Sequence, residues 1–421
     1  MIETAPDAGA GARRLATGSA DVLADVLIVG GGLVGAALAV ALAQAGLQIF
    51  IIDRIDQRGQ LDAGFDGRAS AIAQAPKRML SRLGVWEHLA AATPILDIRV
   101  ADGASKLFLH YDHREIGAAP LGYMVENRHM RRALFQVLGG HAGVTYLAPA
   151  EISATRRDGA SVRLTLKDGS ALAAPLVIGA DGRQSFMRGQ TDIALTSWSY
   201  GQTAIVCTIA HQMPHNNVAH EHFLPAGPFA ILPISGDRSS IVWTERDALV
   251  PQLMALEDDA FLGELGRRFG DFLGTLSLAG PRWTYPLDLQ FAHRCIDTRL
   301  ALVGDAAHGM HPIAGQGLNL GLRDVAALAE VVIEAHRLGL DIGASHILER
   351  YDRWRRFDAM LMLSLTDGIN RLFSNDFAPL ALARDLGLAA VNRSGPLKRF
   401  FMRHAMGEAG RLPKLLKGEL V

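Results

Sequence analysis

The sequence predicts an α/β protein in which a Rossmann-like dinucleotide-binding domain is combined with a smaller antiparallel-sheet domain. Three observations lead to this fold class. A strand–glycine turn–helix–strand unit spans residues 25–54. Two later apolar strands, ending near 180 and 303, each run into a pair of aspartate and glycine. Between these strands, residues 195–285 alternate apolar and polar side chains, as strands of an antiparallel sheet do.

Composition limits the function classes. The chain has 421 residues, a formal net charge of -1 and 49% hydrophobic residues, so nothing global indicates nucleic-acid binding. The two cysteines, Cys207 and Cys295, provide no disulfide framework and suit a reducing compartment. Residues 1–21 are rich in Ala and Gly and lack the apolar core of an export signal. We therefore expect a flexible N-terminal extension there.

The uncharged stretch 26–52 is long enough to cross a bilayer. It divides, however, into a β-branched run, a glycine turn, an Ala-rich helix and a second β-branched run. A βαβ unit whose strands are covered on both faces has the same hydropathy. We expect this buried unit rather than a membrane span.

The first of its turns has the spacing of a dinucleotide-binding loop. Gly30, Gly32 and Gly35 match G-x-G-x-x-G, and Asp53 ends the following strand. Glycines at these positions permit a tight turn, close approach to a pyrophosphate and close helix packing, while the acid can accept a ribose hydroxyl. The motif by itself does not choose between NAD and FAD.

Two further motifs make the pattern specific. The segment GADGRQS occupies 179–185, and GDAAHGMHPIAGQGLNLGLRDVAALAE occupies 304–330. In this order, with the first loop, they resemble the class A flavoprotein monooxygenases, over about residues 22–420. The resemblance implies a p-hydroxybenzoate hydroxylase-like fold with an FAD-binding domain, FAD as cofactor and NAD(P)H as co-substrate.

The resemblance also implies the site residues. The mid-chain Asp181-Gly182 pair would lie near the pyrophosphate and is associated with NAD(P)H, and Asp305 would bind the FAD ribityl chain. The full set of expected cofactor-binding residues is Gly30, Gly32, Gly35, Asp53, Arg54, Arg68, Asn127, Asp181, Gly182, Asp305, Gly315, Gln316, Gly317 and Asn319.

The flavin would carry the chemistry, because its C4a-hydroperoxide hydroxylates an electron-rich ring. Backbone N–H groups of the loop at Gly315–Asn319 would stabilise negative charge on the flavin. His311 and Pro312 would lie near its reactive face. No side-chain catalyst is required by this chemistry. His308 and His311 can also be ordinary loop histidines, and Asp305 can also cap a helix.

The segment 309–330 and the style of the C-terminus most resemble the ubiquinone-biosynthesis 2-polyprenylphenol hydroxylase group. This implies a polyprenylated phenol and O2 as substrates and a cytoplasmic protein, peripheral at the inner face of the membrane. Two alternatives stay open: a hydroxylase of a soluble phenol, and a flavin-bearing structural subunit that organises other ubiquinone-biosynthesis proteins.

We expect four parts of the chain. They are an extension at 1–21, an FAD-binding domain at 22–94, 125–194 and 286–365, a substrate domain at 95–124 and 195–285, and a helical tail at 366–421. From 391 onward the tail has seven basic and two acidic residues interleaved with Leu and Phe. Such a helix suits an anionic membrane surface, a partner protein or packing on the domain. The histidines at 211, 215, 220 and 222 lack a metal-ligand pattern, and we expect no metal.

Overall fold

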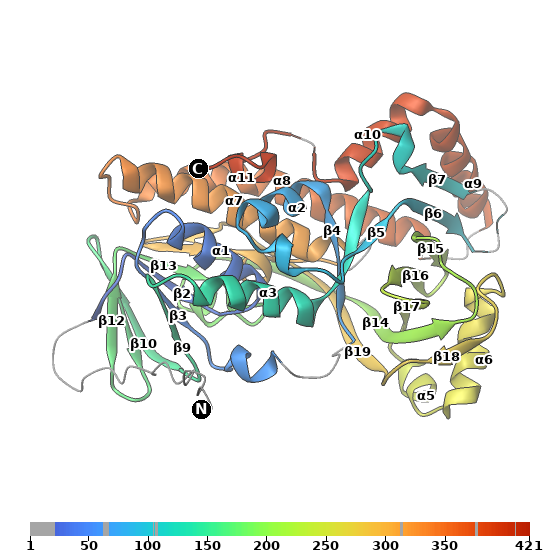
Figure 1. Ribbon diagram of the computed structural model, residues 1–421, viewed down its shortest axis with the longest axis horizontal. Helices are drawn as coiled ribbons and strands as arrows, with labels where there is room; N and C mark the ends of the chain where they lie inside the picture. The colour runs from blue at the N-terminus through green and yellow to red at the C-terminus, as the bar shows by residue number, and fades with distance from the viewer. Residues whose placement is uncertain are drawn as a thin grey trace, which may run out of the picture.

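The computed structural model describes residues 22–421 apart from 62–66, 104, 106, 107, 312–314, 375–377 and 409. The expected extension at 1–21 lies outside the described residues. Two lobes stand side by side, one built on a parallel sheet and one on a mixed sheet, with the C-terminal helices along one edge of both (Figure 1).

The parallel sheet has six strands in the order β20-β21-β13-β2-β3-β9, and all but the β20–β21 pair are parallel. Its strands are β2 (Val26–Val29), β3 (Ile49–Ile52), β9 (Val144–Leu147), β13 (Leu176–Gly179), β20 (Ile296–Asp297) and β21 (Leu300–Leu302). Its strands β2, β13 and β21 are short apolar runs that are buried throughout, as in sheets covered on both faces.

Helix α1 (Leu33–Ala43) packs against both α3 (Asn127–Gly139) and α7 (Gln316–Arg337) over this sheet. The uncharged stretch 26–52 is thus β2, α1 and β3, as expected. No helix in the described ranges is both long enough and apolar enough to cross a membrane.

Two small sheets complete this lobe. The order β1-β12-β11-β10 joins β1 (Val22–Leu23), β10 (Ile152–Arg157), β11 (Val162–Leu166) and β12 (Ala171–Ala174). The order β4-β8-β5 joins β4 (Ala69–Ala73), β5 (Thr93–Ile95) and β8 (Gly122–Glu126). Helices α2 (Gln74–Arg82) and α4 (Phe186–Gly189) follow β4 and β13.

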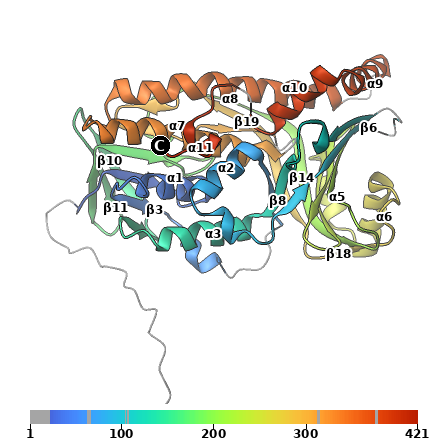
Figure 2. The same cartoon turned by 45° about the horizontal axis from the view of Figure 1, so that its top comes forward.

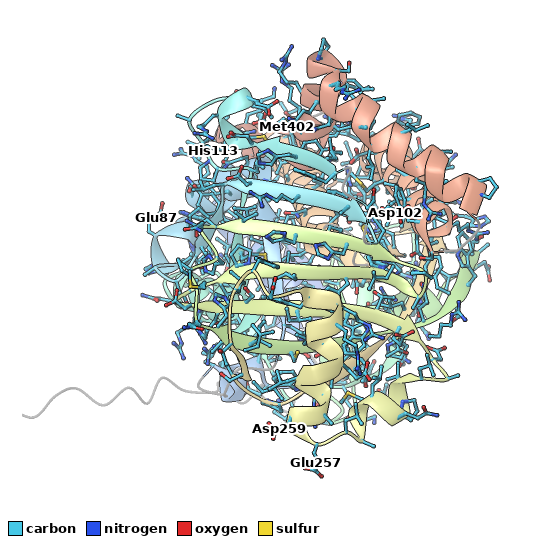
Figure 3. The ribbon with its side chains drawn as sticks, turned by 90° about the vertical axis from the view of Figure 1, so that its right-hand side faces the viewer. Glu87, Asp102, His113, Glu257, Asp259 and Met402 are labelled. Carbon is cyan, nitrogen blue, oxygen red and sulfur yellow. The ribbon has the colours of Figure 1, made fainter. Side chains whose placement is uncertain are left out.

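The second lobe is a nine-stranded sheet in the order β22-β19-β14-β17-β16-β15-β6-β7, with β18 paired to β14. Its strands are β6 (Asp97–Asp102), β7 (Phe108–Asp112), β14 (Leu195–His211), β15 (Val218–Leu224), β16 (Gly227–Ile234), β17 (Arg238–Arg246), β18 (Leu276–Leu278), β19 (Trp283–Ala292) and β22 (His308–Gly309). Every pair is antiparallel except β15 and β6, which run parallel. Helices α5 (Val250–Met254) and α6 (Asp258–Phe269) cover its outer face (Figure 3).

The C-terminal helices are α8 (Ser345–Phe373), α9 (Ala378–Arg393), α10 (Gly395–Ala405) and α11 (Lys414–Lys417). Helix α8 runs along the upper edge of the molecule and α9 lies at the end beside the second lobe (Figure 2). Helices α10 and α11 lead the chain back, and α11 packs against α2 and α7. Four of the expected domain boundaries fall inside elements, at 94/95 in β5, 124/125 in β8, 285/286 in β19 and 365/366 in α8. Continuous elements therefore cross between the parts that the sequence separates.

The predicted fold class is confirmed: a Rossmann-like α/β domain is joined to a smaller, mainly antiparallel sheet. The largest core cluster unites the six-stranded sheet with α1 and α7, and a second one lies between the nine-stranded sheet and α6.

Candidate functional site

The first glycine turn connects β2 to α1 under tight packing. A Cβ on Gly30, whose φ is +103°, would lie 2.3 Å from the carbonyl oxygen of Ala180, and one on Gly35 would lie 2.0 Å from that of Gly30. At Gly32, in contrast, a Cβ would meet nothing within 4 Å. The first and third glycines thus pack the turn, while the second leaves open space before the first turn of α1. The N–H groups of that turn lack intrahelical partners and favour a phosphate.

Asp53 lies directly beside this turn. Its Oδ2 accepts a hydrogen bond from the backbone N–H of Gly31 at 2.8 Å, and its Oδ1 accepts one from that of Ile55 at 3.0 Å. The side chain is buried, whereas the neighbouring Arg54 is exposed. The carboxylate therefore holds the loop in shape as well as marking the end of β3, a double use that the sequence pattern did not reveal.

Arg68 and Asn127 come together at the edge of the three-stranded sheet. The backbone N–H of Asn127 donates to the carbonyl of Arg68 at 2.9 Å, and the Asn127 Oδ1 accepts from the hydroxyl of Ser70 at 2.7 Å. Arg68 is exposed, and Arg128 bonds Glu126 at 2.7 Å. The start of α3 is thus fixed to the start of β4.

The Asp181 carboxylate caps the short helix α4. Its Oδ1 accepts from the hydroxyl of Ser185 at 2.5 Å and its Oδ2 from the N–H of Met187 at 3.0 Å. Gly182 has φ +80°, and a Cβ there would meet nothing within 4 Å. The side chain thus serves the local turn, and the open space lies at the glycine.

Two arginines of this mid-chain element reach the later Gly-Asp element. Arg188 donates to the carbonyl of Ala306 at 2.7 Å, and Arg183 donates to that of Met310 at 3.2 Å. Arg183 also forms an ion pair with Asp288 and lies 3.6 Å from Oδ2 of Asp305. In the sequence these arginines lie beside the mid-chain motif. Nothing local indicates that they join it to the later motif, because their partners lie more than a hundred residues away.

Asp305 presents its carboxylate outward. Its side chain is 51% exposed, and Arg183 is the ion-pair partner found for it among the described residues. Gly304, with φ +59°, precedes it and donates its N–H to Asp324 at 2.9 Å. The helical-cap role considered for Asp305 is not seen among the described residues: it lies inside the short 3-10 turn Gly304–Ala306, whose N-cap is Val303. The exposed carboxylate is available to a ligand hydroxyl.

A buried ionic cluster supports this element from below. Asp324 is fully buried, and its two oxygens lie 2.7 Å from Nε2 of His308 and 2.7 Å from Nε of Arg355. Burial opposes ionisation, but the neighbouring His308 and Arg355 charges lower the pKa of Asp324. His308 is thus a partner of Asp324 rather than a group that faces a ligand, and the sequence offered no signal for this pairing.

The loop before α7 is anchored through Asn319. Its Oδ1 accepts from the N–H of Ala73 at 3.0 Å, and its Nδ2 donates to the carbonyl of Ala71 at 2.7 Å. Gly315 has φ +61°, and a Cβ there would lie 2.9 Å from that of Ala71, whereas one on Gly317 would meet nothing within 4 Å. The N-terminal turn of α7, which includes Gln316 and Gly317, therefore faces open space while Asn319 fixes it to β4.

His311 is completely buried and neither ring nitrogen has a hydrogen-bond partner among the described residues. Its ring packs edge-on against Tyr200 with centroids 5.3 Å apart. Burial, followed by the charge of Arg183, lowers the pKa of His311 to about 3, so the imidazole is neutral at physiological pH. Pro312 lies outside the described residues.

The arrangement fits a dinucleotide that carries a flavin. Three glycines that leave open space, Gly32, Gly182 and Gly317, follow strands or open helices of the same parallel-sheet lobe, together with the outward carboxylate of Asp305. Strands β2 and β13 are neighbours in the sheet and β21 follows, so their carboxyl ends lie at one edge, where ligands bind in such folds.

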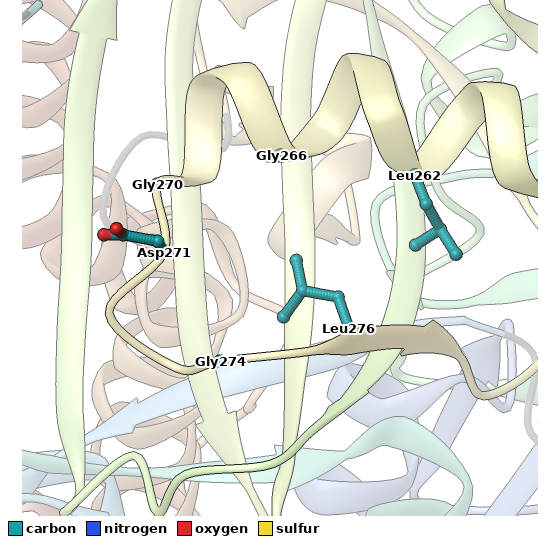
Figure 4. Close-up of a pocket in the computed structure, with 6 residues that line it drawn as sticks. All are labelled: Leu262, Gly266, Gly270, Asp271, Gly274 and Leu276. Carbon is teal, nitrogen blue, oxygen red and sulfur yellow. The ribbon is translucent and has the colours of Figure 1, made fainter.

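Other candidate sites do not match this chemistry. An open hollow beside α6 is lined by Leu262, Gly266, Gly270, Asp271, Gly274 and Leu276, on the outer face of the second lobe (Figure 4). His211 bonds Ser239 and the carbonyl of Met213, and the ring of His220 contacts that of Phe272 at a tilt. No cluster of metal-ligating side chains occurs in the described part of the chain.

Comparison with known proteins agrees with the geometry. The family model described as an FAD binding domain matches residues 23–365. The chain is 57% identical over 406 residues to the ubiquinone hydroxylase UbiL of Rhodospirillum rubrum, covering 96% of this chain and 94% of that protein. It is 36% identical over 388 residues to the 3-demethoxyubiquinol 3-hydroxylase of Escherichia coli, covering 91% and 98%.

A solved structure shares the fold. The p-nitrophenol 4-monooxygenase PnpA of Pseudomonas putida superposes with a TM-score of 0.77 at 18% identity, covering 93% of this chain and all of that one. The two chains thus have the same p-hydroxybenzoate hydroxylase-type architecture. With the matched domain, the relatives and the converging motifs together, the chain belongs to the FAD-dependent aromatic monooxygenases, in the group of the ubiquinone hydroxylases.

Proposed function

We propose that this protein hydroxylates the aromatic ring of a polyprenylated phenol in ubiquinone biosynthesis, with NAD(P)H and O2 as co-substrates. One observation carries the proposal: glycine turns from three distant segments open at the same edge of the parallel sheet, beside the second lobe. The two relatives, named as a ubiquinone hydroxylase and a 3-demethoxyubiquinol 3-hydroxylase, support the substrate class.

The chain's own residues would hold the FAD in sections. The turn at Gly30–Gly35 and the first N–H groups of α1 would bind the pyrophosphate, and Asp53 the adenosine ribose, while Asp305 would accept hydrogen bonds from ribityl hydroxyls. The start of α7 at Gln316 and Gly317 would turn the positive end of its helix dipole toward the ring system. Bound flavin supplies the activation of oxygen.

The protein would contribute positioning and exclusion of water. His311 is neutral and buried, so it can offer one N–H donor and one acceptor without placing a charge beside the ring system. Tyr200, whose ring contacts His311, belongs to one apolar cluster of the second lobe together with Leu287 and Tyr285. An apolar enclosure of this kind favours an aromatic ring and keeps bulk water from the reacting atoms.

Contact with a membrane surface belongs to the same proposal, because a polyprenyl chain partitions into a bilayer. One side of α8 exposes Phe357, Met360, Leu361, Leu365, Ile369 and Leu372, which we call the α8 stripe. Leu397, Phe400 and Phe401 of α10 are also exposed, and Arg353, Arg356, Arg399 and Arg403 are exposed on the same helices. Apolar side chains flanked by arginines suit an anionic lipid surface.

The tail beyond residue 391 contributes less free charge than its sequence indicates. Lys398 is paired with Glu115 at 2.5 Å, Lys414 with Glu334 at 2.9 Å, and Arg411 stacks on Trp354. Helix α11 buries Leu415 and Leu416. We therefore propose that α8 and α10, rather than the tail alone, touch the inner face of the membrane from the cytoplasmic side.

The test is metabolite profiling of quinone intermediates in cells that lack this protein. We expect a prenylated phenol that is short of one ring hydroxyl to accumulate, and a complementing gene to remove it. Normal ubiquinone levels without such an intermediate would contradict the pathway. Rescue by an Asp305→Ala protein shown to lack FAD would instead favour a structural subunit over an enzyme.

A further inference from the structure

The inner face of the nine-stranded sheet carries an ionisable side chain that the flavin site does not use. The strand registers align one residue from each of seven strands into a row across this face. In order from β7 to β19 the row is Leu109, Val100, Glu221, Ala230, Val242, Val206 and Trp283. All members are apolar except Glu221.

The direction of Glu221 follows from its neighbours on β15. His220 and His222 point to the outer face, where they contact Phe272 and Phe229 of the α6 cluster. Ala219 and Phe223 point to the inner face, where they pack with Met124 and Phe373. Because side chains alternate along a strand, Glu221 lies on the inner face between Ala219 and Phe223.

Glu221 has no hydrogen bond or ion pair to another described residue in the structure, and its side chain is only partly buried. On the same face, Asp102 of β6 is paired with Arg384 at 2.6 Å, so these two charges satisfy each other. Burial alone raises the pKa of Glu221 to about 8. An acid without a partner among apolar neighbours destabilises the fold unless another polar group meets it.

The same face leads from Glu221 to the flavin side. Val242 lies two strands away, about 10 Å at the usual strand spacing. Val242 packs in one cluster with Tyr200, whose ring contacts His311. Closer to Glu221, Ala219 of the same strand and face packs in one cluster with Ala71 of β4, the strand that anchors the start of α7 through Asn319. A ring bound between the sheet and the start of α7 would therefore lie beside Glu221.

We propose that Glu221 binds the phenolic hydroxyl of the aromatic substrate and so fixes which ring carbon faces the flavin. This inference rests on the proposed function and deepens it, since it names the group that orients the ring. The phenolic hydroxyl is the polar group that such a substrate brings to a row of side chains that is apolar apart from Glu221. A carboxyl can donate to it or accept from it, according to its protonation.

The test is equilibrium binding to the FAD-loaded protein by calorimetry, with 2-geranylphenol and its methyl ether as probes. The wild type should bind the phenol at least tenfold more tightly than the ether. Glu221→Leu should lose this preference, and Glu221→Gln should keep part of it. The control His222→Leu, on the same strand but the opposite face, should keep it in full. FAD content and thermal midpoint report that each variant is folded.

Each outcome has a distinct meaning. An unchanged preference in Glu221→Leu, or a wild type that does not distinguish phenol from ether, overturns the role of Glu221 and leaves the proposed function standing. A wild type that binds neither prenylated probe overturns the substrate class, and the role of Glu221 with it. Product analysis adds a second readout, because the leucine variant should release a mixture of ring positions and more hydrogen peroxide per NAD(P)H.

Discussion

Arg183 Nε lies 3.6 Å from Oδ2 of Asp305, although 122 residues separate them in the chain. The contact joins the mid-chain Asp-Gly element to the later Gly-Asp element. Arg183 also pairs with Asp288 and bonds the carbonyl of Met310, so it holds the strand before the second motif and the loop after it. The carboxylate of Asp305 is thereby directed while it stays half exposed to a ligand.

Replacing Asp305 with alanine should release FAD. A hydrogen bond to a charged acceptor contributes about 1.5–3 kcal/mol, so we expect FAD affinity to fall roughly tenfold to hundredfold. Flavin absorbance relative to protein absorbance and a fluorescence titration measure this. The exposed Asp192 provides the control, since Asp192→Ala should bind FAD as the wild type does. Full flavin content in Asp305→Ala would exclude the assigned role.

Gly32 and Gly35 should respond differently to alanine. At Gly35 the new Cβ would lie 2.0 Å from a backbone oxygen, and we expect roughly 2 kcal/mol or more of lost stability in the FAD-free protein. At Gly32 the Cβ meets open space, so stability should change by less than about 0.5 kcal/mol while FAD binding weakens. Urea unfolding and FAD titration separate the two effects. Wild-type FAD affinity in Gly32→Ala would show that no phosphate approaches that glycine.

Local patterns predicted the fold because each strand–turn–helix unit carries its own signal. The glycine turns at 30–35, 182 and 315 lie where the spacing placed them. The uses of Asp181 as a cap and of Asn319 as an anchor to β4 were not predicted. Asn319 meets Ala73 across 246 residues of chain, and no local pattern reports such a contact.

For single side chains, the sequence also did not show which lie on the surface and which lie in the interior. The apolar spacing of α8 reads as a core-facing stripe, since helices usually bury such residues. Its inward side is instead formed by Leu363, Thr366, Asn370 and Phe373, and the α8 stripe is exposed. Glu221 is likewise one acid between two histidines in sequence, and only the sheet register separates its face from theirs.

Glu221 should make stability depend on pH in a predictable direction. Its pKa is about 8 in the folded chain and near 4.5 when unfolded, so the folded state holds the extra proton between these values. The free energy of unfolding that the protonated Glu221 side chain contributes is therefore lost as pH rises from 4.5 to 8. Glu221→Gln should match the wild type at pH 5 and exceed it at pH 8 by roughly 1–3 kcal/mol, given its partial burial. Urea unfolding of both proteins at both pH values measures this. An equal difference in the free energy of unfolding at pH 5 and at pH 8 would refute the prediction.

The α8 stripe should bind lipid. We expect the protein to co-sediment with vesicles containing anionic phospholipid. A triple variant with serine in place of Phe357, Leu361 and Leu365 should partition into these vesicles at least tenfold more weakly. Each exposed apolar side chain adds of order 1 kcal/mol when it is buried. Met213, Leu249 and Phe272, similarly exposed on the second lobe, provide the matched triple control. Equal loss in both triple variants would mean that the α8 stripe is not the docking face.

The central claim is tested most directly by turnover under isotopic oxygen. Purified FAD-loaded protein is supplied with a short-chain prenylphenol, NADH or NADPH and 18O2, and the mass of the product is measured by mass spectrometry. The account predicts one labelled oxygen on the ring for each NAD(P)H consumed. Consumption of NAD(P)H that yields only hydrogen peroxide with the prenylphenol, while a water-soluble phenol is labelled, would contradict it.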